Sequence, residues 1–137
     1  MDTKTKQKLL DLIGKSRDAI VGSIDDDGFP NAKAMFRIKN DGLSTFWFST
    51  NVSAIRTAQF MQRPKACIYF TKRFHGLMLT GTMQVHMDDE TKKAFWRTGD
   101  EMYYKLGPTD PDYCVLKFTA SMGRYYANYK SESFIIE

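Results

Sequence analysis

The stretch from Thr45 to Phe60, TFWFSTNVSAIRTAQF, constrains the fold more than any other, because it joins a predicted strand to a predicted helix through a short polar turn. Phe46 and Phe48 recur with the period of two that is typical of a strand. The pattern breaks at Ser49-Thr50-Asn51, and Ser53 is then in position to cap a helix. We therefore expect a strand, a turn and a helix that ends before the next proline.

The start of this helix is a candidate anion site. Unpaired backbone N–H groups and the positive end of the helix dipole lie at a helix N-terminus. Ser49, Thr50 and Ser53 add hydroxyl groups, and Arg56 adds a cation in the predicted first turn. This combination favours a phosphate group. The alternative is an ordinary capped helix with an exposed arginine.

The rest of the chain reads as short strands separated by turn signals. On this pattern the predicted strands cover residues 18–24, 31–39, 45–49, 66–70, 77–87, 113–119 and 123–129. The predicted helices cover residues 4–13, 54–63 and about 89–106. Gly81, in the middle of the longest strand, predicts a bulge or a tight bend. These elements favour a mainly β protein with helices (α+β), in which six or seven strands form a closed antiparallel barrel with helical attachments.

One predicted strand, NAKAMFRIK, alternates clearly but leaves its orientation open. Ala32 and Phe36 belong to the face that we expect to pack, while Lys33, Met35 and Arg37 belong to the face that carries charge. That second face is either solvated, with lysine and arginine stems lying along the surface, or directs Lys33 and Arg37 into a groove shared with the helix start.

Length and composition limit the class of protein. The 137 residues fit one domain, residues 1–137, and 42% hydrophobic with 26% charged residues is typical of a globular chain. The net charge of +4 is spread along the sequence, and its longest cationic cluster, Lys72-Arg73 followed by Phe74 and His75, reads as a loop. Ten Phe, seven Tyr and two Trp suit either a β-rich core or the binding of a planar ligand.

Cysteine usage and the N-terminus point to a cytoplasmic protein. Cys67 and Cys114 lie in apolar runs without CxxC spacing, so we expect two buried free thiols and no metal site. The first fourteen residues contain no apolar stretch that would serve as a signal peptide or a membrane span. We therefore expect no membrane partner.

Three segments together resemble a known family. GFPNAKAMF, FWFSTNVSAIRTAQFMQRPKACIYF and GLMLTGTMQV, in this order and spacing, resemble the pyridoxamine 5′-phosphate oxidase-like FMN-binding split barrels. Within that family they are most similar to the group related to general stress protein 26. The resemblance implies a split β-barrel that forms a homodimer, with FMN in a cleft between the two subunits.

The resemblance also implies which residues hold the cofactor. They are Lys33, Met35, Ser49, Thr50, Ser53 and Arg56. Gly76 stands where the oxidases carry a glutamine that contacts the flavin, and Ile55 stands where they carry another basic residue. No further segment follows Phe134-Ile135-Ile136 to match the oxidases' C-terminal segment. We therefore do not expect oxidation of pyridoxamine phosphate.

Three functions are consistent with these observations. The first is a flavin-dependent oxidoreductase of unknown substrate, linked to stress, in which the cofactor supplies the chemistry and no protein residue is assigned as a catalyst. The second is a protein that binds flavin, haem or a related cofactor as a sensor, without turnover. The third, a nucleic-acid-binding barrel, is less consistent with the scattered basic residues. His75 and His86 are expected to be loop or strand-face residues.

Overall fold

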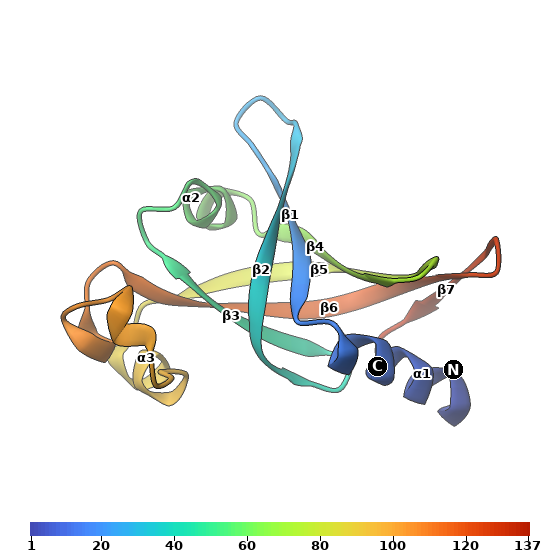
Figure 1. Ribbon diagram of the computed structural model, residues 1–137. Helices are drawn as coiled ribbons and strands as arrows, with labels where there is room; N and C mark the ends of the chain where they lie inside the picture. Colours follow the sequence, from blue (N-terminus) through green and yellow to red (C-terminus); the bar gives the residue numbers. More distant parts are fainter.

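The computed structural model describes residues 1–137 and contains one antiparallel sheet that closes into a barrel (Figure 1). The strand order is β3-β2-β1-β4-β5-β6-β7, and β3 also pairs with β6. Six strands therefore form the barrel and β7 extends it. The strands are β1 (Asp18–Ile24), β2 (Pro30–Asp41), β3 (Thr45–Asn51), β4 (Lys65–Lys72), β5 (His75–His86), β6 (Tyr113–Ala127) and β7 (Lys130–Ile135). This confirms the expected antiparallel split barrel with flanking helices.

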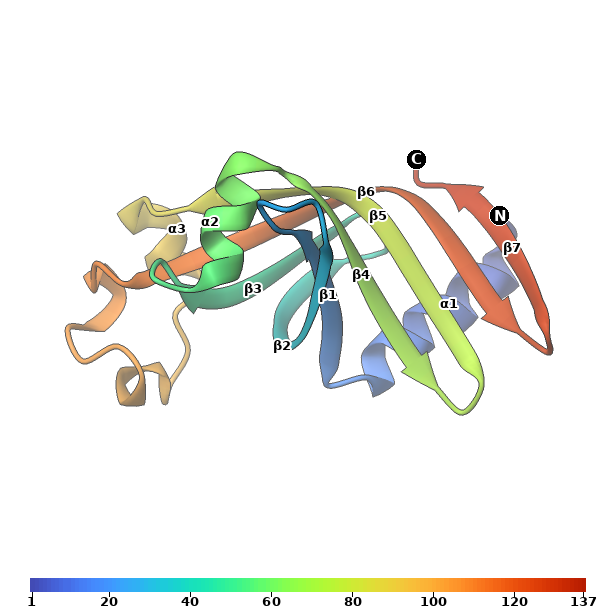
Figure 2. The same cartoon turned by 90° about the horizontal axis from the view of Figure 1, so that it is seen from above.

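Three helices lie around the barrel: α1 (Thr3–Lys15), α2 (Ile55–Gln62) and α3 (Asp89–Ala94). Figure 2 shows α2 and α3 at one end of the barrel and α1 at the other. Two short 3-10 turns, Asp100–Met102 and Gly107–Thr109, connect α3 to β6. No helix is both long and apolar enough to cross a membrane.

The barrel interior is filled by alternate residues of its strands. Phe46 and Phe48 of β3 are fully buried, as the period of two predicts, and Leu77 and Leu79 of β5 join the same core. Gly81 marks a register shift in the β5–β6 ladder, so the predicted bulge is confirmed. A Cβ atom at Gly81 would lie 1.9 Å from a backbone oxygen of β6, which explains why this position carries no side chain.

The orientation expected for β2 is wrong. Met35 is buried in the core, whereas Phe36 is 57% exposed. The apolar set that includes Ala32 and Phe36 therefore faces outward, and Lys33, Met35 and Arg37 share the inward side. A strand that carries apolar residues on both faces does not reveal which face the core will take.

Three element boundaries also differ from the expectation. The helix expected over residues 89–106 ends at Ala94, because Trp96 turns in to pack against Tyr113, with ring centroids 5.3 Å apart. The strands expected at 113–119 and 123–129 are one continuous strand, β6. The loop expected at 71–76 is a hairpin whose turn, Arg73-Phe74, has positive φ at both residues. Sequence signals for such turns rest on glycine and asparagine, which are absent there.

Candidate functional site

The pairing between β2 and β3 stops short of the end of the barrel where α2 begins, and we call this unpaired part of the two strands the opening. Their ladder ends where Arg37 pairs with Phe48. Beyond that point residues 30–36 of β2 pair only with β1, and residues 49–51 of β3 pair only with β6. Both views show the two strands diverging here (Figure 1 and Figure 2). The predicted anion-binding residues lie on the two sides of this opening.

Thr50 and Arg56 form the centre of the site. The Thr50 side chain is buried, and its Oγ1 accepts a hydrogen bond of 2.7 Å from Nη2 of Arg56. Arg56 forms no ion pair with any carboxylate, and its Nε atom is buried without a hydrogen-bond partner. Partial burial lowers the pKa of the guanidinium. A half-buried cation with an unsatisfied donor is suited to an anion supplied from outside the chain.

The nearest titratable groups do not balance this charge. Sγ of Cys114 lies 3.6 Å from the Thr50 carbonyl oxygen, and the Tyr104 hydroxyl donates a hydrogen bond to Oδ1 of Asn51. Burial is the main cause that raises the pKa of Cys114 to about 11 and that of Tyr104 to about 12. Both groups are neutral at pH 7, so the charge of Arg56 stays uncompensated.

Ser53 does not cap α2, contrary to the expectation. The helix begins after Ala54, which makes no side-chain cap. Instead Asp112 holds Ser53: one carboxylate oxygen accepts from its backbone N–H at 2.9 Å, and the other accepts from its hydroxyl at 3.1 Å. The second oxygen also accepts from Nδ2 of Asn51 at 2.8 Å. These hydrogen bonds, led by that from the Ser53 backbone, lower the pKa of Asp112.

Ser49 and Thr50 lie on opposite faces of β3. The strand runs on to Asn51, so the break expected at residues 49–51 is wrong. Thr50 faces inward towards Arg56, and the alternation of the strand turns Ser49 to the outer face. Its Oγ is buried there and makes no hydrogen bond. On the side of β3 that faces Arg56, Ser49 can therefore bind a ligand only through its backbone.

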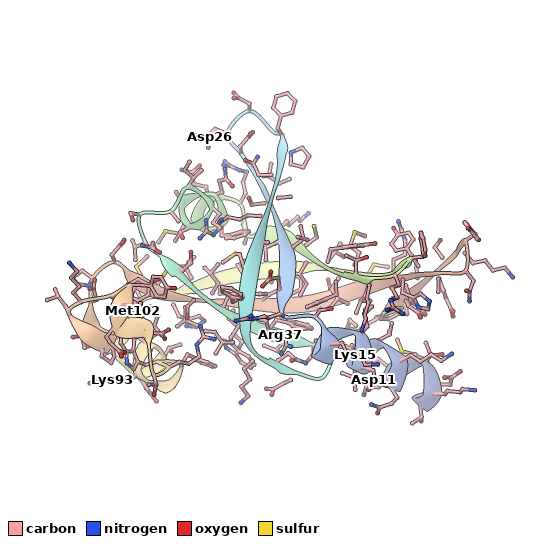
Figure 3. The ribbon with its side chains drawn as sticks, in the orientation of Figure 1. Asp11, Lys15, Asp26, Arg37, Lys93 and Met102 are labelled. Atoms are coloured by element: carbon pink, nitrogen blue, oxygen red, sulfur yellow. The ribbon has the colours of Figure 1, made fainter.

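Lys33 and Met35 border the opening from β2. Lys33 is exposed and forms no ion pair, and Met35 is buried in the core, so that only its backbone is available to a ligand. Arg37 does not share their groove. Its guanidinium donates to Oδ1 of Asn40 at 2.6 Å and to the carbonyl oxygen of Ile13 at the end of α1. Figure 3 labels Arg37 near the end of α1 that carries Lys15. Of the two alternatives left open for this face, the one in which Arg37 shares a groove with Arg56 therefore does not hold.

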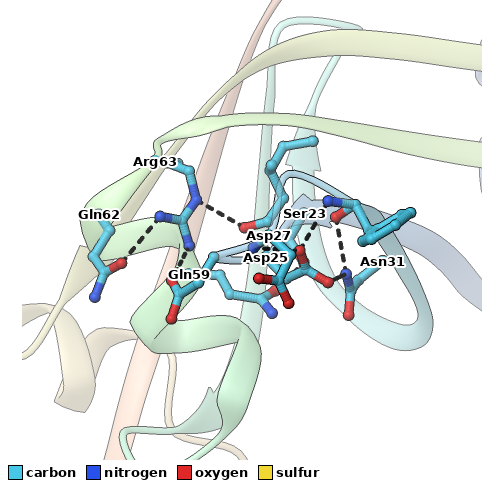
Figure 4. A network of polar contacts seen from close by, with 10 residues as sticks. Ser23, Asp25, Asp27, Asn31, Gln59, Gln62 and Arg63 are labelled. Carbon is cyan, nitrogen blue, oxygen red and sulfur yellow. Dashed lines mark hydrogen bonds and ion pairs between the residues drawn. The ribbon is translucent and has the colours of Figure 1, made fainter.

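A polar network missed in the sequence fixes α2 against the β1–β2 hairpin (Figure 4). The Ser23 hydroxyl hydrogen bonds to Gln59 of α2. Arg63, just after the helix, donates to the carbonyl oxygen of Ile24 and pairs with Asp26 at 2.7 Å. Because these contacts set the position of α2, they also set where Arg56 stands. Gln59 and Arg63 gave no sequence signal, since their partners lie more than 30 residues away.

An apolar groove of about 820 Å³ crosses the outer face of β1, β2, β4 and β5. Its lining includes Ile20, Ala32, Cys67 and Tyr69. Cys67 is half-buried here, whereas the sequence predicted a buried thiol; Cys114 is buried as expected. Next to the groove, a Cβ atom at Gly76 would lie 2.0 Å from the Tyr69 hydroxyl oxygen, so the Tyr69 ring fills the space of a side chain at that position.

The two histidines take the positions expected of them, one at each end of β5. Nδ1 of His75 lies 3.0 Å from the Tyr125 hydroxyl, and Nδ1 of His86 lies 3.6 Å from Asp88. Neither is bonded to the Thr50–Arg56 pair. No group of three or more His, Cys, Asp or Glu residues is placed to hold a metal ion.

Comparisons with known proteins agree on one family. The family model described as pyridoxamine 5′-phosphate oxidase like matches residues 4–137. A crystal structure from Clostridium acetobutylicum, of a protein related to general stress protein 26 of Bacillus subtilis in the pyridoxinephosphate oxidase family, is 41% identical with a TM-score of 0.90. That match covers 99% of this chain and 97% of the other.

Two more distant structures share the fold. General stress protein 26 from Bacillus anthracis is 16% identical, with a TM-score of 0.78 over 98% of this chain and 100% of the other. A NimC/NimA family protein from Clostridium acetobutylicum is 19% identical, with a TM-score of 0.73 over 96% of this chain and 94% of the other. No curated protein sequence matches the chain.

Proposed function

The chain belongs to the pyridoxamine 5′-phosphate oxidase-like family, as its sequence motifs predicted, and on this premise we propose that it binds FMN at the opening between β2 and β3. The observation that carries the proposal is Arg56, a half-buried guanidinium with no carboxylate partner and an unsatisfied Nε. A phosphate is doubly charged and accepts several hydrogen bonds, so it supplies what this side chain lacks.

The other proposed residues bind FMN from both sides of the opening. Thr50 orients Arg56 through its hydrogen bond and offers its own hydroxyl to the phosphate. Lys33, exposed and unpaired on β2, approaches from the opposite side, and Met35 and Ser49 contribute backbone groups. Ser53 reaches the phosphate only by leaving Asp112, so its contribution is the smallest of the six.

The outer groove supports a homodimer. Most of the surface that lines it is apolar, and Ile20 and Phe36 are exposed on the same outer face of β1 and β2. A second copy of the chain over β1, β2, β4 and β5 would cover Ile20 and Phe36 and bring a second subunit close to the opening beside β2. We therefore place the flavin ring between two subunits.

The reaction we assign is a flavin-dependent oxidoreduction of a substrate not yet known, linked to stress through the 41% identical relative. FMN supplies the redox chemistry when bound, and the protein supplies binding and electrostatics. Pyridoxamine phosphate is not the proposed substrate, because Tyr69 fills the position where the oxidases' glutamine would stand. The two free thiols suit a reducing compartment such as the cytoplasm.

A cofactor-binding protein without turnover is the second candidate. Cys114 and Tyr104, the titratable groups beside Arg56, remain protonated at pH 7 and provide no general base there. Measuring oxidation of NAD(P)H by the FMN-loaded protein would separate the two. Steady turnover supports the oxidoreductase, and an absence of turnover supports the binding protein.

The FMN site itself is tested with a matched pair of lysines on β2. Lys33→Gln should weaken FMN binding by roughly tenfold, because a charged contact to phosphate contributes about 1.5–3 kcal/mol and an exposed lysine supplies the lower part of that range. Lys39→Gln removes the same charge from the same strand beyond the opening, where Lys39 faces Asp41, and should leave affinity unchanged. Equal effects of the two changes would show only a general electrostatic attraction.

A further inference from the structure

Two tight hairpins project side by side from the end of the barrel opposite α2 and α3. The turn between β4 and β5 is Arg73-Phe74, and the turn between β6 and β7 is Asn128-Tyr129. They are neighbours because β5 and β6 pair next to them, with Gly76 opposite Tyr126. Figure 1 and Figure 2 both show the two turns at the same end of the molecule. We call them the hairpin tips.

Each hairpin tip presents an aromatic side chain to solvent. Phe74 is 95% exposed and Tyr129 is fully exposed, more than any other large apolar side chain of the chain. All four turn residues have positive φ, a conformation that favours glycine and costs stability when a bulky residue adopts it. Two aromatic residues kept in this conformation at two adjacent turns indicate a role for the side chains themselves.

Cations surround the hairpin tips. Lys72, Arg73 and Lys130 flank the two aromatics and are exposed. A groove of about 550 Å³ between the tips and α1 adds Lys8 and Lys15. Asp11 is the only carboxylate residue in its lining, and none of these five cations forms an ion pair. The charge is therefore available to an anionic partner.

We propose that the hairpin tips dock this protein onto the surface of an anionic phospholipid bilayer. Phe74 and Tyr129 would enter the interface between headgroups and acyl chains, while the surrounding lysines and arginine contact lipid phosphates. This is peripheral attachment, and it revises the expectation that the protein has no membrane partner.

The shape of the surface favours a membrane over other anions. Aromatic side chains at the apices of two turns form a protruding surface, which suits a flat and deformable partner. A single-stranded nucleic acid needs aromatic faces arranged along a groove, so that successive bases stack on them. An acidic peptide would use the groove beside α1 and leave both aromatic residues in water.

The test is co-sedimentation of the full chain with vesicles of phosphatidylcholine alone or mixed with phosphatidylglycerol. The expected result is binding to the mixed vesicles only, weakened by salt. Phe74→Gly combined with Tyr129→Gly should abolish binding while the fold is kept, because glycine relieves the positive φ at both positions. Tyr103→Ala, which removes an equally apolar and 77% exposed residue from the opposite end, is the control and should bind normally.

The charge contribution has its own pair of variants. Lys72→Gln and Arg73→Gln should each lower the partition coefficient roughly fivefold, the effect of about one charge near an anionic surface. Lys93→Gln, an exposed lysine on α3, should change nothing. The proposal is overturned if mixed vesicles do not bind, if the double glycine variant binds as well as the parent, or if the tips instead bind a single-stranded oligonucleotide while ignoring vesicles.

Discussion

Replacing Arg56 by methionine should weaken FMN binding without weakening the fold. Methionine keeps much of the length and apolar volume of the side chain while removing its charge and its donors. Hydrogen bonds between charged groups contribute about 1.5–3 kcal/mol each, so losing one strong contact to phosphate should raise the dissociation constant of FMN roughly 10- to 150-fold. Riboflavin has the same ring and no phosphate, so its affinity should hardly change.

The stability of the cofactor-free protein should respond differently. Arg56→Met removes the hydrogen bond to Thr50, which costs about 1 kcal/mol, and also removes a desolvated cation that has no carboxylate partner. The two effects oppose each other, so the free energy of unfolding should change by less than about 1 kcal/mol. Adding Thr50→Val removes the remaining unpaired hydroxyl and should restore or raise stability.

Fluorescence titration with FMN and riboflavin, together with urea denaturation, measures both effects. Arg73→Met, which changes an exposed arginine in the turn between β4 and β5, at the end of the barrel opposite α2, is the control. The reasoning would be refuted if Arg56→Met weakened FMN and riboflavin equally, since the phosphate would then lie elsewhere. A loss of several kcal/mol in the cofactor-free protein would also refute it, because Arg56 would then be a structural residue.

Further expectations concern the barrel and its thiols. Gly81→Ala should lower the free energy of unfolding by more than about 2 kcal/mol in urea denaturation, because the new Cβ would meet a β6 backbone oxygen; a negligible loss would mean that the bulge yields freely. Cys114 should resist thiol reagents at about pH 8 while the half-buried Cys67 reacts, and equal rates would contradict the burial of Cys114. Burial raises the pKa of Cys114 to about 11 and those of Tyr104 and Tyr113 to about 12, so the unfolded chain loses these protons first. The stability that these three groups contribute should therefore be constant between neutral pH and about pH 9 and fall as the pH rises through 9 to 12, and stability that rose in this range would reverse the argument.

The fold was predicted correctly from the sequence where the local residue pattern matches the burial that the structure shows. The alternation of Phe46 and Phe48 and the glycine at 81 identified a strand and a bulge correctly, because both depend on neighbours along the chain or on backbone geometry. The Arg73-Phe74 turn was missed because its positive φ is imposed by strand pairing on residues that do not prefer it. The Asn128-Tyr129 turn was missed because the strand predicted over 123–129 runs through it. The inward turn of Met35 was missed because both faces of β2 carry apolar residues.

The candidate site was predictable in part. Arg56 and Thr50 were both identified, and the structure brings them into contact. Ser53 was predicted to be a helix cap because nothing in the local pattern indicates that Asp112, 59 residues later, would hold it. Ser49 was grouped with Thr50 as part of a turn, whereas the continuing strand places the two side chains on opposite faces. Local sequence spacing cannot predict contacts between residues that lie far apart in the chain.

The absorbance spectrum of the protein after loading with FMN and gel filtration tests the central claim most directly. We expect a visible flavin band that elutes with the protein at the size of a homodimer, with one FMN bound per chain. A colourless protein peak, with all FMN eluting as free ligand, would contradict the assignment of the Thr50–Arg56 pair as a flavin phosphate site.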